Sequence, residues 1–294
     1  MTASPDLHGR NIVITGGNSG IGREAAVALA GMGAHVVITA RDARKGEAAR
    51  KEIIDRSANS DAEVVALDLA SLASIRACAT DLLERFDRLD VLVNNAGGTL
   101  SQRRVTDDGF EVTFGVNHLG HFLLTNLLLE RIEKSAPARI VTVASGAHLA
   151  ARRGLDFDDL QCERSRYRGF QVYCRSKLAN VLFANELARR LDGTGVTSNS
   201  MHPGYVHTNF AREGDTGAFG WVSHWFGRPF SISPEKGADT IVYLASSPDV
   251  EGVTGQYFYK RALARMSNRA EDPEAQRRLW EVSEQLVGLA PSET

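Results

Sequence analysis

The sequence of 294 residues predicts an α/β fold, with helices on both faces of a doubly wound parallel sheet. Short, continuously apolar runs alternate with longer amphipathic runs along most of the chain, which is typical of β-α-β units. The apolar runs contain few polar positions, and this indicates strands that are covered on both faces. Right-handed crossovers then place the carboxyl ends of the strands on one edge of the sheet, where ligands bind.

The apolar runs predict strands in a single Rossmann-type domain, in the order 3-2-1-4-5-6-7. They lie at Asn11–Thr15, His35–Thr39, Glu63–Leu67, Asp90–Val93, Arg139–Ala144, Val196–Met201 and Gln256–Tyr259. The amphipathic runs predict helices at Gly20–Ala30, Ala43–Ser57, Ser71–Phe86, about Asp108–Ser135, Phe170–Arg190, Pro234–Ala245 and 270–288. We expect one domain over 1–294, because this length is close to what one core serves, and a flexible segment at 1–8.

Composition excludes several classes of protein. Lys+Arg total 34 and Asp+Glu total 36, so no basic excess would draw the chain to nucleic acid. The 3 cysteines are few and widely spaced, which argues against a disulfide framework or a zinc site and favours a reducing compartment. No apolar stretch approaches the ~20 residues that span a bilayer. We therefore expect a cytoplasmic protein without a membrane anchor, a metal or a nucleic-acid partner.

Two segments break the alternation of strands and helices. Leu149–Gly169 is a polar excursion, and 209–233 is rich in glycine and aromatic residues. A long irregular segment in a compact domain is typically a lid or a mobile loop. The aromatic residues favour a lid over an apolar substrate, and a dimer contact or a plain surface loop is the alternative.

A glycine-rich turn follows the first strand and opens the first helix. It reads Thr15-Gly16-Gly17-Asn18-Ser19-Gly20-Ile21-Gly22. Glycines let the backbone approach a pyrophosphate, whose charge meets the amide N–H groups and the positive end of the helix. Glycines alone are also common in ordinary turns, but this position between strand and helix predicts a dinucleotide site.

The end of the second strand indicates which cofactor binds. An acidic residue about 20 positions after the glycines would bond the ribose hydroxyls of NAD. This strand is instead followed by Arg41, whose guanidinium suits the 2′-phosphate of NADP. We therefore predict NADP(H), while Asp42, also placed to cap the next helix, leaves NAD(H) open.

Further cofactor contacts are expected where other strands end. Asp68 follows the third strand and could bond the adenine amino group or cap a helix. The remaining expected contacts are Leu69, Asn95, Ala96, Gly97, Pro203, Gly204, Val206 and Thr208.

Tyr173 and Lys177 are four positions apart in a predicted helix and therefore share one face. A free tyrosine has a pKa near ~10, and a neighbouring ammonium favours the phenolate, so the pair predicts a proton donor or acceptor. Such a pair also arises by chance on helix surfaces. Ser145, at the end of the fifth strand, could donate to the substrate oxygen or merely form a turn. Asn117 is a mid-helix amide that needs a partner, and we expect a water that reaches Lys177.

The other reactive side chains are interpreted as structural. His118, His148, His202 and His207 show no metal-like grouping such as HExxH. Cys174 points away from the face that carries Tyr173 and is expected to pack in the interior.

These motifs in order resemble the short-chain dehydrogenase/reductase family, from about Asn11 to Gly255. The resemblance implies that Asn117, Ser145, Tyr173 and Lys177 form a catalytic tetrad, with Tyr173 and Lys177 also beside the cofactor. It implies phosphate contacts from Gly16, Ser19, Gly20, Ile21 and Gly22, and Asn18 of the same turn is a further expected cofactor contact. It further places Arg41 at the 2′-phosphate, Asp68 at adenine, and Asn94 and Thr208 around the nicotinamide nucleoside.

A narrower resemblance is to retinol dehydrogenases and their bacterial relatives. It is carried by Asn117-His118-Leu119-Gly120-His121-Phe122-Leu123-Leu124-Thr125, by Tyr173-Cys174-Arg175-Ser176-Lys177-Leu178-Ala179-Asn180 and by Leu279-Trp280-Glu281-Val282-Ser283-Glu284. It implies interconversion of a carbonyl and an alcohol with NADP(H), on a retinoid-, steroid-, lipid- or aromatic-carbonyl-like substrate. A homodimer or homotetramer stays open.

Two other functions fit the same fold. A dehydratase or epimerase usually has a larger C-terminal substrate domain than this chain offers. A non-catalytic dinucleotide sensor or scaffold often loses the tyrosine or the lysine, and this chain keeps both.

Overall fold

The computed structural model describes residues 5–204 and 232–290. The strands of these residues form one sheet in the order β3-β2-β1-β4-β5-β6-β7-β8, parallel from β3 to β7. They are β1 (Asn11–Ile14), β2 (His35–Ala40), β3 (Ala62–Ala66), β4 (Val91–Asn94), β5 (Ala138–Val143), β6 (Val196–Met201), β7 (Tyr257–Tyr259) and β8 (Ala262–Leu263). The predicted doubly wound sheet is confirmed. The antiparallel β8 was not predicted, because a strand of two residues is too short to give a periodic signal.

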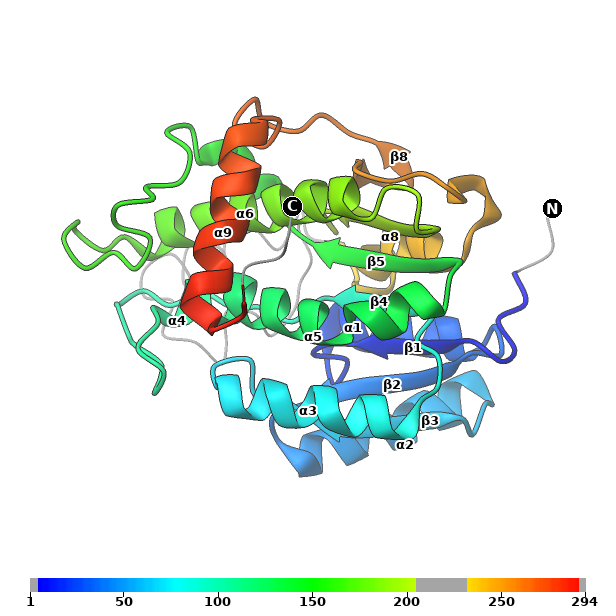
Figure 1. Cartoon of the computed structure of the whole chain (residues 1–294). Coiled ribbons are helices and arrows are strands. Elements are labelled where there is room, and N and C mark those ends of the chain that lie inside the picture. The colour runs from blue at the N-terminus through cyan, green and yellow to red at the C-terminus, as the bar shows by residue number, and fades with distance from the viewer. Residues whose placement is uncertain (1–4, 205–231, 291–294) are drawn as a thin grey trace.

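Helices cover both faces of this sheet (Figure 1). On one face lie α1 (Gly20–Ala30), α2 (Ala43–Ser57) and α8 (Pro234–Ser246), which share one buried apolar cluster. On the other face lie α3 (Leu72–Arg85), α5 (Gly120–Lys134), α6 (Gly169–Arg190) and α9 (Pro273–Val287), which share the second cluster. The sheet therefore lies between two packed layers of helices, and the carboxyl ends of its parallel strands lie between these layers.

The long helical region begins at Val112 and not near Asp108 as expected. The Glu111 carboxylate is fully buried and accepts from the N–H groups of Thr113 at 2.8 Å and Phe114 at 2.7 Å, which caps the helix there. The run then continues as α4 (Val112–Phe114), the π-helical segment η1 (Gly115–Leu119) and α5. A π turn inserts one residue into the helical repeat and is frequent at functional sites. Here it carries Asn117.

The predicted C-terminal helix is α9, which crosses α6 as the red helix of Figure 1. The Trp280 ring is 3% exposed and lies 4.9 Å from Phe122 and 5.9 Å from Phe183, between ring centroids. The Arg190 guanidinium lies 4.2 Å from the centroid of the Trp280 ring. The helix is thus part of the core that backs the catalytic elements.

Some predictions fall on residues that the structure does not describe. These are residues 1–4, His207, Val206, Thr208 and the expected lid from 209 to 231. Of the N-terminal segment expected to be flexible, Leu7 is buried and its N–H donates to Met32 O at 2.9 Å. Among the helices of the described ranges, none combines the length and apolar character needed to cross a membrane.

Candidate active site

Two side chains meet just beyond the carboxyl end of β5. Ser145 precedes the short 3-10 helix η2 (Gly146–Ala150), and Tyr173 lies in the first turns of α6. The Tyr173 hydroxyl and Ser145 share a hydrogen bond. Ser145 Oγ also accepts from Ala147 N–H at 3.1 Å, so this serine forms a turn and faces Tyr173 at once.

The pKa of Tyr173 differs from the expectation. Burial of the hydroxyl raises this pKa to about 12, and the hydrogen bond with Ser145 offsets only part of the rise. Lys177 Nζ lies 5.8 Å from the centroid of the Tyr173 ring. Desolvation of the phenolate therefore dominates, and the lower tyrosine pKa expected from the neighbouring ammonium is not found in the chain itself. Tyr173 is held protonated, as a proton donor must be.

Lys177 lies on the same face of α6 and is 3% exposed. Its Nζ donates to Val143 O at 3.0 Å, and Asn180 Nδ2 donates to the same oxygen at 3.2 Å. Burial lowers the pKa of Lys177 to about 8, because the ammonium loses water. This lysine therefore changes charge close to neutral pH.

Asn117 is completely buried in η1, and protein groups bond its whole amide. Its Oδ1 accepts from Gly98 N–H at 2.8 Å, while its Nδ2 donates to Gly98 O and to Ser176 Oγ, both at 2.9 Å. The amide thus has protein partners on both its atoms, and the water expected to reach Lys177 stays a prediction. A Cβ on Gly97 would lie 3.0 Å from Asn117 Oδ1 and 3.4 Å from Lys177 Nζ, so both side chains flank one backbone segment. The fold brings the four residues of the expected tetrad together.

The glycine-rich turn has the backbone that a phosphate cradle needs. Gly16 and Gly20 have φ values of +64° and +56°, a region that glycine adopts without strain. Ser19 is the N-cap of α1, yet its side chain makes no capping hydrogen bond. Asn18 and Ile21 are partly exposed beside it. The first N–H groups of α1 thus lack a side-chain cap, and such N–H groups bind anions.

The turn leaves no room for side chains. A Cβ on Gly22 would lie 2.4 Å from Asn95 Nδ2 and 2.7 Å from Gly16 O. A Cβ on Gly16 would lie 2.9 Å from that of Ala96. Asn95 Nδ2 also donates to Thr15 O at 2.7 Å, which fastens the turn to the end of β4.

Gly22→Ala is expected to weaken NADPH binding by about 10-fold or more, which corresponds to about 1.4 kcal/mol. The added methyl group must displace the Asn95 amide or the turn itself. Titration of the bound cofactor by fluorescence measures the effect. Gly31→Ala at the other end of α1 is the control, because Gly31 has helical dihedral angles and its Cβ would come no nearer than 3.3 Å to Val27 O and 3.5 Å to Ala28 O. Equal dissociation constants for the two variants would contradict the role of the glycine-rich turn in binding NADPH.

The region after β2 carries the residues that choose the cofactor. Arg41 is exposed and makes no hydrogen bond or ion pair with another described residue. The Asp42 carboxylate accepts from the N–H groups of Arg44 at 2.9 Å and Lys45 at 3.0 Å, so it caps α2 as predicted. The backbone bond from Lys45 lowers the pKa of Asp42. Arg41, which has no partner among the described residues, is thus adjacent to Asp42, whose carboxylate is already hydrogen-bonded.

Residues after β3 divide between the sheet edge and the core. Asp68 Oδ1 accepts from Ala70 N–H at 3.0 Å, and Ser71 is the cap of α3, so the alternative of Asp68 as a helix cap is wrong. Leu69 is 8% exposed and packs on α5, where a Cβ on Gly120 would lie 2.7 Å from Leu69 O.

Asn94 ends β4 with its side chain in the core. It is completely buried, and its Nδ2 donates to Thr125 Oγ1 at 2.9 Å. The place of Asn94 near the nicotinamide nucleoside, which the family resemblance implies, stays a prediction. Gly97, three residues later, is exposed at the edge.

Pro203 and Gly204 follow β6 and turn the chain at this edge. Gly204 has a φ of +88°, and its N–H donates to His202 Nδ1 at 3.0 Å. The His202 ring stacks on Tyr259, with 4.1 Å between centroids. An aromatic wall thus borders the end of β6.

The sequence analysis missed two site residues. His148 was set aside as structural, yet its Nδ1 donates to Ser145 O at 2.8 Å and its Nε2 accepts from Ser267 N–H at 3.3 Å. The Tyr257 ring lies 4.8 Å from His148, and its buried hydroxyl makes no hydrogen bond with the described residues. Burial raises the pKa of Tyr257, and Tyr173 adds to the rise. A buried tyrosine in the short strand β7 gives no sequence signal that it lies beside Tyr173.

His118 and Cys174, which were also set aside, are in the core. His118 is 1% exposed among the rings of Phe114, Phe122 and Phe183. Cys174 is 2% exposed in the same cluster, as predicted.

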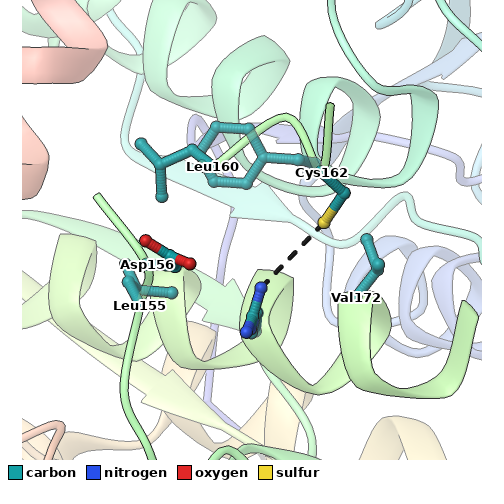
Figure 2. A pocket seen from close by; sticks show the side chains of 7 residues that line it. Leu155, Asp156, Leu160, Cys162 and Val172 are labelled. Atoms are coloured by element: carbon teal, nitrogen blue, oxygen red, sulfur yellow. Dashed lines mark hydrogen bonds between the residues drawn. The ribbon is translucent and has the colours of Figure 1, made fainter. Parts of the chain in front are cut away.

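A small cavity lies in the excursion between Ser145 and Tyr173 (Figure 2). Its volume is about 10 Å³, which one water would fill. Val172 and Arg175 line it, and the Arg175 guanidinium lies 4.0 Å from Cys162 Sγ, the dashed line of Figure 2. By helical periodicity these two residues are on the face of α6 away from Tyr173. The cavity is a packing void and not a substrate site.

Comparison with known proteins agrees with this geometry. The family model described as short chain dehydrogenase matches residues 10–155. Human retinol dehydrogenase 13 is 45% identical over 97% of this chain and 87% of its own length, and mouse retinol dehydrogenase 14 is 47% identical over 96% and 87%.

Solved structures show the same fold. An uncharacterized protein from Mycobacterium paratuberculosis is 37% identical, with a TM-score of 0.79 over 97% of this chain and 96% of that one. The Pseudomonas aeruginosa RhlG/NADP active-site complex is 27% identical, with a TM-score of 0.70 over 88% and 97%. The identity of 45% and 47% to the two retinol dehydrogenases, over nearly the whole chain, establishes the family. The chain is an oxidoreductase that acts on CH–OH groups and belongs to the retinol dehydrogenase-like branch of the short-chain dehydrogenase/reductase family.

Proposed function

We propose that this chain is an NADP(H)-dependent oxidoreductase that reduces an apolar carbonyl compound to its alcohol. The observation that carries the proposal is the pair of Ser145 and Tyr173, which share a hydrogen bond at the sheet edge with the Tyr173 pKa raised. A protonated phenol beside a second hydroxyl can hold a carbonyl oxygen and donate a proton to it.

The residues fit NADP(H). The cradle of Gly16 and Gly22 has no room for a Cβ, the N-terminus of α1 lacks a side-chain cap, and the Arg41 guanidinium is unpaired among the described residues. Asp42, the residue that kept NAD(H) open, is engaged by the helix that it caps. This arrangement supports the phosphorylated cofactor over NAD(H). When bound, the nicotinamide supplies or accepts the hydride.

The chain's own groups handle the oxygen and its proton. Ser145 and Tyr173 hold the substrate oxygen, and the Tyr173 hydroxyl gives its proton to that oxygen as negative charge develops there. Lys177, charged below its pKa of about 8, stabilises the phenolate that remains. Asn117, bonded to Gly98 and Ser176, holds the segment around Gly97 against Lys177.

The relatives' names and the site walls support an apolar substrate. Retinol, the alcohol in those names, is large and apolar. The rings of His202, Tyr257 and Tyr259 near Ser145 would suit such a molecule. A sensor without turnover is the less favoured alternative, because Tyr173, Lys177 and Asn117 are all in place.

The proposal is tested by following NADPH oxidation by absorbance with retinal, long-chain aldehydes, steroid ketones and aromatic ketones. We expect turnover with at least one bulky apolar carbonyl and little with small polar ones. NADPH binding without turnover across this panel would favour the sensor. Turnover of small polar carbonyls alone would overturn the apolar substrate class.

Arg41→Ala is expected to raise the KM for NADPH by about 10-fold, the effect of about 1.4 kcal/mol, and to leave the KM for NADH unchanged. The guanidinium would meet the 2′-phosphate, which NADH lacks. Arg44→Ala is the matched control, because it removes an exposed arginine three residues away. An equal rise in the KM for NADPH and for NADH would contradict the assignment of Arg41 to the 2′-phosphate.

A further inference from the structure

His121 connects the dinucleotide turn to the helix that carries Asn117. It is 1% exposed in the first turn of α5, four residues after Asn117. Its Nδ1 lies 3.1 Å from the main-chain oxygen of Asn117, and its Nε2 lies 2.9 Å from Thr15 Oγ1. One imidazole therefore joins the start of the cofactor turn to the π segment.

The neighbouring groups determine where its proton sits. A carbonyl oxygen only accepts, so Nδ1 donates to Asn117 O. Thr15 Oγ1 accepts from the N–H groups of Asn95 at 2.8 Å and Ala96 at 3.0 Å, which uses its two lone pairs. Its own proton then goes to Nε2 at 2.9 Å, because the competing main-chain acceptor is farther away, at 3.3 Å. The ring of His121 is neutral, with its proton on Nδ1.

The imidazole is also protected from protonation. Burial lowers the pKa of His121 to about 4, the bond to Asn117 opposes this, and the charge of Lys177 adds to the lowering. A ring that stays neutral at working pH moves no proton. Its contribution is therefore geometric.

We propose that His121 is a positioning residue that holds the cofactor turn and Asn117 in one fixed arrangement. The inference rests on the function proposed above. Thr15 Oγ1 accepts from the N–H groups of Asn95 and Ala96, which follow the carboxyl end of β4. The Asn117 side chain accepts from Gly98 N–H in the same segment. The imidazole closes this ring of hydrogen bonds. A shift of about 1 Å at a catalytic group costs up to about 10²-fold in rate, so the closure matters for both binding and turnover.

Two variants each keep one of the two bonds. In His121→Asn the amide nitrogen takes the place of Nδ1 and still donates to Asn117 O, but Thr15 loses its acceptor. In His121→Gln the amide oxygen takes the place of Nε2 and still accepts from Thr15, but Asn117 O loses its donor. We expect His121→Asn to raise the Kd for NADPH and His121→Gln to lower kcat, each by about 10-fold, with the other constant within about 3-fold.

His118→Gln is the matched control. His118 is as buried as His121 and lies three residues earlier, but its Nε2 bonds Ser283 Oγ of α9 at 2.9 Å, away from the cofactor turn. Glutamine can keep that bond as well. We expect both constants to stay within about 3-fold, which shows that replacing a buried imidazole is not itself the cause.

The crossed pattern is the result that supports the proposal. A purely structural histidine would change Kd and kcat in parallel and in step with Tm, and this would overturn it, as would no change in either variant. If the parent chain turns nothing over, the proposed function fails, and the Kd values of the two variants still decide the Thr15 contact. Imidazole ¹⁵N spectra decide the tautomer independently, and a proton on Nε2, or protonation near pH 6, would also overturn it.

Discussion

Tyr173→Phe is expected to reduce turnover by about 10²–10⁴-fold, the usual contribution of a positioned acid or base. The ring stays and only the hydroxyl is lost, so the Kd for NADPH should change little. The loss is expected because the Tyr173 hydroxyl, which is hydrogen-bonded to Ser145, is the proposed proton donor. Steady-state assays with the best carbonyl of the panel and a fluorescence titration give the two numbers.

Tyr243→Phe provides the comparison for Tyr173→Phe. Tyr243 lies on α8 and faces Phe258 at 6.5 Å between centroids, on the other side of the sheet. It should turn over at the parent rate. Near-normal turnover of Tyr173→Phe would remove this tyrosine from the chemistry.

Lys177→Met is expected to reduce turnover by about 10²–10³-fold, as the loss of one preorganised charged donor does elsewhere. Methionine fills the buried volume but cannot stabilise a phenolate or donate to Val143 O. Lys134→Met is the control, because Lys134 is 67% exposed at the end of α5. The kcat of each variant, measured at saturating NADPH, makes the comparison.

The same lysine determines a pH dependence. Its pKa is lowered to about 8, so it is charged below that pH and neutral above it. Reductive turnover in the parent chain should therefore be level below pH 8 and fall as the pH rises through this value. The residual activity of Lys177→Met should lack this decline. A decline near pH 8 that persists in the variant assigns the ionisation to another group.

The sheet and the order of its strands could be predicted from periodicity, because buried parallel strands are continuous apolar runs. Caps were predictable where one side chain acts on the next turn, as Asp42 does. The π segment was not, since its 5 residues are too few to change the apolar periodicity of the long helical run. Asp68 shows the same limit, because Ser71 takes the capping role three positions closer to the helix.

At the site, motif spacing identified the four residues that come together but not what each one touches. The partners of Asn117 are far away in sequence, at Gly98 and Ser176. His121 and His148 are bonded to the main-chain oxygens of Asn117 and Ser145, and a main-chain contact has no residue signature in the sequence. The pKa of Tyr173 also depends on how deeply its hydroxyl is enclosed, which spacing does not reveal.

The docking of α9 has a consequence for biosynthesis. Chains emerge from the ribosome N-terminus first, and Phe122 and Phe183 are complete long before Trp280 exists to cover them. A nascent chain that has made its sheet therefore presents uncovered apolar rings until the last helix is synthesised. Premature termination before α9 would release a product with those rings exposed and with His118 deprived of Ser283. Quality control in the cell would meet such fragments as aggregation-prone species, even though they contain every residue of the chemical centre.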